Sequence, residues 1–136
     1  MNLAQLLVRA ARVHPERPAV LVGDRPQWTY RELADRTSRL AGHLRDGLGL
    51  QPGDRVAVYM TNHVAYLEVL YAAWWAGLAV VPINAKLHPR EVEFILGDAG
   101  AAVLFVSDDL AAELQPLLGG LPALRQVFTP SDPAYE

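Results

Sequence analysis

The stretch Val69–Asn84, with the sequence VLYAAWWAGLAVVPIN, contains no charged residue. A helix that crosses a membrane needs roughly 20 consecutive apolar residues, and this stretch is shorter and is interrupted by Gly77 and Pro82. Glycine often follows the last turn of a helix, and the β-branched residues after Gly77 favour a strand. We therefore predict a helix that ends near Gly77, followed by a short buried strand. The stretch is interpreted as core rather than as a membrane anchor.

Strand patterns and helix patterns alternate along the chain from Gln51 onward. Strands are predicted over 53–60, 78–84, 101–107 and 125–129, separated by helices over 62–77, 88–100 and 108–120. Such alternation, with short and continuously apolar strands, is typical of a parallel sheet covered by helices on both faces. We predict a three-layer, parallel-rich α/β fold with the strand order 80–83, 56–60, 102–106, 126–128.

The first 50 residues form a separate pattern of helix, hairpin and helix. Asn2 and Gln5 have the spacing of a capping box for a first helix, which ends before Pro15. A short hairpin is predicted near residues 19–30. Thr29 and Glu32 form a second capping-box pattern, which predicts that the next helix begins at this point. Residues 1–128 are read as one α/β subdomain, and residues 129–136 as a polar tail or the boundary of an expressed piece.

Composition narrows the possible functions. The chain has 136 residues, a formal net charge of −3 and dispersed arginines, which gives no electrostatic reason for binding nucleic acid. It has no cysteine, which excludes disulfides and thiolate metal sites. No transmembrane segment is predicted, and Arg9 and Arg12 interrupt the only N-terminal apolar pattern, so we expect a cytoplasmic protein.

A search for reactive groups finds no complete catalytic constellation. Lys86 is the only lysine, and no glycine-rich phosphate loop follows a strand. The four histidines lack the spacing of a metal site. The polar residues 61–63 and the pair Asp108–Asp109 are interpreted as helix caps. We therefore assign no catalytic, cofactor-binding or metal-ligating residue to this chain.

Several ordered segments resemble the adenylate-forming, AMP-binding enzymes. WTYREL at 28–33 is similar to their Thr-Tyr-x-Glu-Leu element, and AWWAGLAVVPIN at 73–84 is similar to their Ala-Gly-x-x-x-Val-Pro-x-Asn element. GDRVAVYM at 53–60 and the segment 87–101 continue the match over essentially the whole chain. The resemblance implies the N-terminal subdomain of that fold. The positions that carry the family motifs, with architectural roles, are Thr29, Tyr30, Glu32, Leu33, Gly77, Pro82 and Asn84.

The resemblance also implies an activity for the complete enzyme. Pro82 followed by Ile83 and Asn84 favours the fatty-acid–CoA ligase type of acyl-CoA synthetase. Such enzymes join a carboxylate to ATP, assisted by Mg²⁺, and then pass the acyl group from the acyl-AMP to coenzyme A. The family's phosphate loop, ribose-binding aspartate and catalytic lysine have no counterpart in this sequence. We therefore expect an N-terminal fragment that is inactive alone and binds none of ATP, Mg²⁺ or coenzyme A.

Two kinds of partner follow from this interpretation. The first is the remainder of the full-length enzyme, which would cover part of the apolar 64–76 helix. The second is another copy of the chain, by self-association through an exposed part of that helix or through a sheet edge. An alternative function remains, that of a stand-alone α/β binding or interaction module without catalysis.

Overall fold

The computed structural model describes residues 1–132 and residue 135. Its main sheet has four strands in the order β4–β3–β5–β6, and all neighbouring pairs are parallel. The strands are β3 (Arg55–Tyr59), β4 (Ala79–Ile83), β5 (Val103–Val106) and β6 (Gln126–Phe128). The strand order predicted from the sequence is confirmed.

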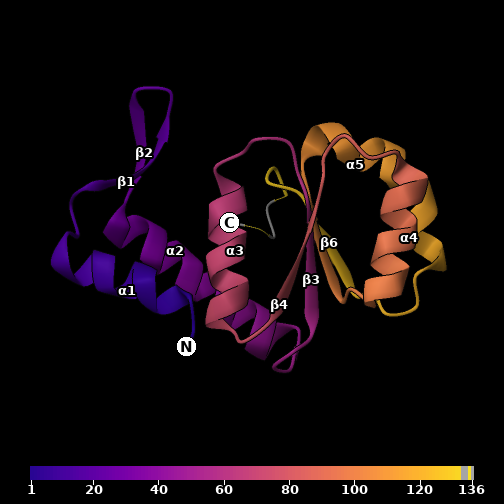
Figure 1. The fold of residues 1–136 in the computed structure, drawn as a ribbon, viewed down its shortest axis with the longest axis horizontal. Helices are drawn as coiled ribbons and strands as arrows, with labels where there is room; N and C mark the ends of the chain where they lie inside the picture. The colour runs from indigo at the N-terminus through magenta and orange to yellow at the C-terminus, as the bar shows by residue number, and fades with distance from the viewer. Residues whose placement is uncertain (133–134, 136) are drawn as a thin grey trace.

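Helices cover both faces of this sheet, as the three-layer prediction required (Figure 1). One face is covered by α3 (Ala65–Trp75), and α2 (Tyr30–Gly42) and α1 (Ala4–Val13) pack against the outer side of α3. The other face is covered by α4 (Pro89–Ala99) and α5 (Asp108–Leu114). Among the described residues, no helix is both long and apolar enough to cross a membrane.

The end of α3 follows the sequence prediction. Gly77 takes the left-handed conformation with a φ of 79°, which favours glycine because a side chain would be strained there. Its backbone N–H donates to the carbonyl of Trp74 at 3.0 Å, and the N–H of Leu78 donates to Ala73 at 2.8 Å. These bonds satisfy carbonyls that the helix leaves open and turn the chain directly into β4.

The apolar surface of α3 is covered largely within this chain. The sheet packs on one side of the helix, and α1 and α2 pack on the other, so that Val69, Ala72 and Ala73 are fully buried. The prediction of an exposed helix surface holds for Leu67, whose exposed fraction is 41%. Strand β4 is an open edge of the sheet, where Pro82 is exposed. Sequence outside this chain is therefore not required to cover most of α3.

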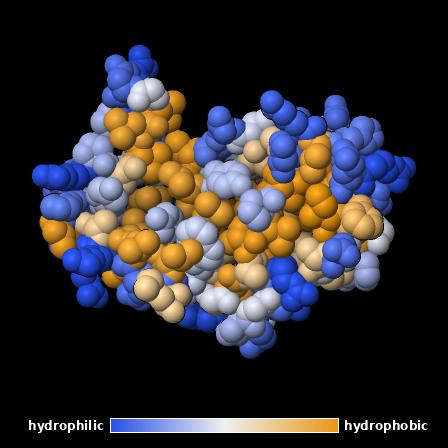
Figure 2. Space-filling model, in the orientation of Figure 1, coloured by the Kyte–Doolittle hydropathy of each residue, from blue (hydrophilic) through white to orange (hydrophobic). Residues whose placement is uncertain are grey.

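The predicted hairpin is present as β1 (Pro18–Val22) and β2 (Arg25–Thr29), an antiparallel pair that projects from the body (Figure 1). Apolar residues of this region reach the surface in the space-filling view, and Leu21 and Val22 are about half exposed (Figure 2). The capping box after the hairpin is present too. The backbone N–H of Thr29 donates to the Glu32 carboxylate at 2.7 Å, and the N–H of Glu32 donates to the Thr29 hydroxyl at 3.2 Å.

Three local predictions are wrong. Leu3, not Asn2, occupies the N-cap position of α1, although the Asn2 side chain does accept from the N–H of Ala4 at 2.9 Å. Ser107 occupies the N-cap position of α5, and its side chain makes no capping bond. The predicted 108–120 helix changes at Gln115 into a 3₁₀-helix that runs to Gly120 (η2), because Pro116 and the two glycines cannot continue an α-helix.

Replacing a central aromatic ring tests this core. Phe105 in β5 is fully buried, and its ring stacks on Phe128 with the ring centroids 5.2 Å apart. We expect Phe105→Ala to lower the free energy of unfolding by about 3–5 kcal/mol, because it opens a cavity in the sheet. The control Leu6→Ala, at a position 58% exposed, should change it by less than about 0.5 kcal/mol. Urea unfolding followed by tryptophan fluorescence measures both, and equal effects would contradict this core.

Candidate functional site

The candidate site lies where the strand order reverses. The chain leaves β3 toward β4 on one side, whereas it leaves β5 toward β6 on the other, and β3 and β5 are neighbours. In open parallel sheets, such a switch point at the carboxyl ends of the strands is where ligands usually bind. Two loops meet there, one running from β3 to α3 and the other from β5 to α5.

Polar groups from the two loops bind one another at this edge. The backbone N–H of Thr61 donates to the Ser107 hydroxyl at 3.2 Å, and the N–H of Ser107 donates to the carbonyl of Tyr59 at 3.2 Å. The Thr61 hydroxyl also contacts a carboxylate oxygen of Asp109 at 3.4 Å. Ser107 is only 4% exposed, so its hydroxyl joins the loops instead of facing a ligand.

The segment after β6 adds a second polar contact to the same edge. The Ser131 hydroxyl donates to a carboxylate oxygen of Asp108 and lies 3.4 Å from the Thr129 hydroxyl. The hydrogen bond from Ser131 is the main reason why the pKa of Asp108 lies below its usual value, with a smaller contribution from Thr129. Asp108 therefore stays ionised and holds the segment after β6 against α5.

The Tyr59 side chain closes the edge on the α4 face. Its hydroxyl donates to the carbonyl of Leu87 at 3.0 Å, so β3 is joined to the loop before α4. Burial raises the pKa of the Tyr59 hydroxyl above its ordinary value, and the carboxylates of Glu113 and Asp109 raise it further. The hydroxyl is therefore held as a neutral hydrogen-bond donor.

A buried ion pair fixes the first turns of α3 beside this edge. Glu68 is 3% exposed, and its carboxylate lies 3.3 Å from Nε of Arg36 on α2. The Tyr135 hydroxyl donates to the same carboxylate at 2.9 Å, while the Arg36 guanidinium lies 4.7 Å from the ring centroid of Trp28. These contacts bring together α2, α3, the hairpin and the C-terminal segment.

The sequence showed only part of this network. Glu68 was recognisable as the single charge in an otherwise apolar helix, but its partners lie 32 and 67 residues away. The tail 129–136 was read as polar, yet Tyr135 packs against Phe105 with ring centroids 6.1 Å apart. Residues 133, 134 and 136 lie outside the described residues. The division of the chain at residue 128 stays a prediction.

The predicted motif positions occupy architectural places in the described structure. Thr29 and Glu32 form the capping box, and Leu33 packs beneath the hairpin with Tyr30 beside it. The other three follow α3: Gly77 ends the helix, Pro82 lies on the edge strand, and the Asn84 side chain accepts from the N–H of Lys86 at 2.9 Å.

The described residues do not form a cluster of metal ligands. Within residues 1–132 and 135, no three His, Asp or Glu side chains gather closely enough to hold a metal ion. His63 and His88 each accept a backbone N–H near the start of a helix, from Ala65 at 3.1 Å and from Arg90 at 3.2 Å. The groups at the switch point are engaged with one another. That this chain alone binds neither ATP nor Mg²⁺ stays a prediction.

A family model described as AMP-binding enzyme matches residues 7–135. The chain belongs to this family. Among curated members, it is 43% identical to a feruloyl-CoA synthase of Amycolatopsis sp over 113 residues, which are 83% of this chain and 23% of that protein. It is 36% identical to a long-chain-fatty-acid–CoA ligase of Salmonella typhimurium over 118 residues, which are 86% of this chain and 21% of that protein.

The solved structures agree with this assignment. The anthranilate CoA ligase AuaEII in complex with anthranoyl-AMP superposes with a TM-score of 0.88 at 26% identity, over 95% of this chain and 24% of that chain. This chain therefore spans between a fifth and a quarter of the length of the curated relatives it matches. Its α/β fold is that of the N-terminal part of acyl-CoA and aryl-CoA ligases.

The Asp108–Ser131 contact predicts a shifted titration. In the wild-type chain, the Asp108 carboxyl should titrate below its ordinary pKa of 3.8, and Ser131→Ala should raise that pKa toward the ordinary value. Because the folded-state pKa is lowered, the contact stabilises the fold above the unfolded-state pKa and stops doing so as the pH falls through the folded-state pKa. Carbon-detected NMR titration of the carboxyl measures the shift. An Asp108 pKa that Ser131→Ala leaves unchanged would show that the contact does not form in solution.

The Arg36–Glu68 pair predicts strong coupling between two helices. Arg36→Met should lower the free energy of unfolding by about 3 kcal/mol, because it removes the cation that balances a buried carboxylate. The double variant Arg36→Met, Glu68→Met should recover most of that loss, since neither charge then remains. A double-mutant cycle by urea unfolding measures the coupling. If the two single losses simply add in the double variant, the pair does not interact.

Proposed function

We propose that this chain forms the N-terminal scaffold of an AMP-forming carboxylate–CoA ligase and does not catalyse the reaction by itself. The observation that carries the proposal is the family match over residues 7–135. The polar edge at the β3–β5 switch point supports it, because that edge offers a rigid surface beside which the remainder of an enzyme can build an active site.

The proposed reaction has two steps in the complete enzyme. The substrate carboxylate attacks the α-phosphate of ATP and releases pyrophosphate, which leaves an acyl-AMP. The thiol of coenzyme A then attacks the acyl carbon and displaces AMP. Mg²⁺ would offset phosphate charge in the first step. We assign no nucleotide or metal ligand to this chain, and propose that its part is to hold the sheet edge through Thr61, Ser107 and Tyr59.

The proposed substrate is a fatty acid. The Pro82-Ile83-Asn84 sequence and the 36% identity to a long-chain-fatty-acid–CoA ligase support this choice. The second candidate is an aromatic carboxylate, which the 43% identity to a feruloyl-CoA synthase favours. The switch point does not favour either substrate, because Thr61, Ser107 and Asp109 are bonded to each other there.

A chimera tests the scaffold role. Residues 1–136 replace the matching N-terminal segment of the Amycolatopsis feruloyl-CoA synthase, and the product is incubated with ATP, Mg²⁺, coenzyme A and either ferulate or a long-chain fatty acid. We expect thioester and AMP from the chimera, and no AMP above background from residues 1–136 alone. The same chimera with Phe105→Ala, which weakens the scaffold core, should lose activity on warming before the parent chimera does.

The outcomes separate the two functional readings. A folded chimera that makes no thioester would contradict the scaffold role, and steady AMP release by the 136-residue chain would contradict its inactivity. The alternative of a stand-alone binding module predicts that this chain binds ATP or a stable acyl-adenylate analogue with a Kd below about 100 μM in calorimetry. Tight binding without turnover would favour the module.

A further inference from the structure

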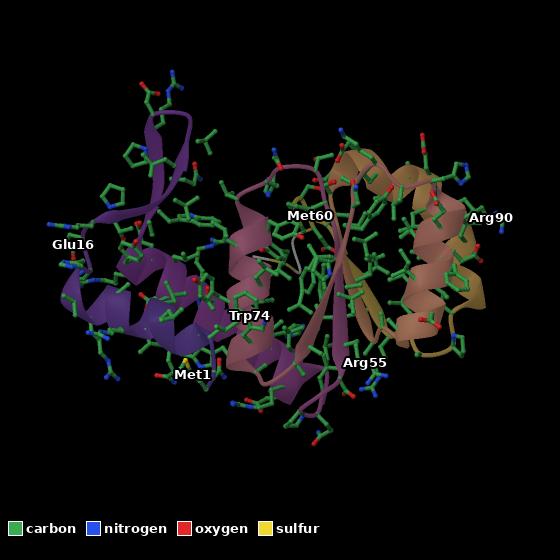
Figure 3. All side chains as sticks on the ribbon, viewed as in Figure 1. Met1, Glu16, Arg55, Met60, Trp74 and Arg90 are labelled. Carbon is green, nitrogen blue, oxygen red and sulfur yellow. The ribbon has the colours of Figure 1, made fainter. Side chains whose placement is uncertain are left out.

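The outer face of α4 exposes a large aromatic ring beside a hollow. Phe94 is 72% exposed, more than any other described large apolar side chain except Met1. The ring lines a hollow of about 380 Å³ together with Leu87, Arg90, Glu91 and Ile95. A projecting ring and a depression thus lie side by side on one helix, on the side that points away from the sheet, where Arg90 is seen (Figure 3).

Opposite charges flank this ring at equal distances. Arg90 precedes Phe94 by four residues and Asp98 follows it by four, and all three side chains are exposed. Residues three or four apart lie on the same face of a helix, so the face presents Arg90, Phe94 and Asp98 in that order, with the Glu91 carboxylate next to Arg90. A two-fold axis through Phe94 reverses the order, which places each Arg90 opposite the Asp98 of a second copy.

We propose that two copies of this chain associate through α4, packed antiparallel about a two-fold axis at Phe94. Each Phe94 ring enters the hollow beside Leu87 and Ile95 of the other copy, and two Arg90–Asp98 pairs close the ends. Such an isologous contact needs one self-complementary surface, which α4 provides. The Arg90–Glu93 ion pair within α4, at 3.1 Å and with Arg90 70% exposed, is of a kind that stabilises little and does not hold Arg90 away from a partner.

Other exposed apolar surfaces fit a second copy less well. The exposed residues Leu6 and Val13 on α1 are flanked by Arg9 and Arg12, so a two-fold pairing there would bring like charges together. The open edge of β4 contains Pro82, which has no N–H to donate to a further strand. The Arg90–Asp98 pairing therefore favours α4 over these two surfaces, independently of the proposed ligase role.

The test is the oligomeric state of the 136-residue chain in solution. Because an 11-residue helix offers less contact than a standard interface, we expect a weak dimer, with a Kd on the order of 10–100 μM. Sedimentation velocity at low salt over a concentration series measures it. Phe94→Ser should weaken dimerisation by about tenfold or more, because it removes the central anchor. The matched control Leu21→Ser, at an exposed position on the hairpin, should leave the Kd unchanged.

A charge exchange makes the test specific for this geometry. Arg90→Asp alone and Asp98→Arg alone each place like charges together, and each should weaken the dimer by about tenfold. The double variant Arg90→Asp, Asp98→Arg restores opposite charges and should return the Kd to within about threefold of the wild type. Asp35→Arg on α2 serves as the control for charge alone. The proposal is overturned if the wild-type chain stays monomeric at every concentration. It is also overturned if Phe94→Ser leaves the dimer Kd unchanged, or if the double variant does not recover the wild-type Kd.

Discussion

An apolar helix that lies between two layers is the constraint on which this structure depends. Helix α3 carries a single charge, and its surface needs cover on more than one side because apolar area exposed to water destabilises a fold. The sheet covers one side, and α1 and α2 cover the other. The single charge, Glu68, is tolerated inside because Arg36 and Tyr135 bind its carboxylate. The N-terminal helices, the hairpin and the C-terminal segment all have their places set by α3.

The loops at the carboxyl ends of β3 and β5 are held in place by this packing and by their own hydrogen bonds. These loops are short and are joined by Ser107, Thr61 and Tyr59, whose hydrogen bonds cross between elements. In a member of the AMP-binding enzyme family, a fixed edge of this kind suits a site whose reactive groups come from another part of the protein. Thr61 and Ser107 at this edge hold the two loops together.

The packing of helices on the sheet also explains which faces of α4 and α3 are exposed to solvent. The α4 helix faces its own sheet through Val92 and Leu96, which are buried, while its opposite side meets solvent with Phe94. The charges of Arg90 and Asp98 lie on either side of this ring and allow the two-fold pairing proposed for this face. Self-association through the α3 helix, by contrast, has little surface to use, because Leu67 is its single strongly exposed apolar side chain among the described residues.

The local sequence was sufficient to predict the features that depend on one turn or on the length of one helix. Gly77 ended α3, Thr29 and Glu32 began α2, and the alternation after Gln51 predicted a parallel sheet with its strand order, since short apolar strands and intervening helices leave few arrangements. Tertiary structure alone decided what is distant in sequence. In the folded chain Glu68 binds Arg36 and Tyr135, Ser107 occupies the N-cap position of α5, and Phe94 is exposed to solvent. These three features depend on which surfaces come into contact when the chain folds.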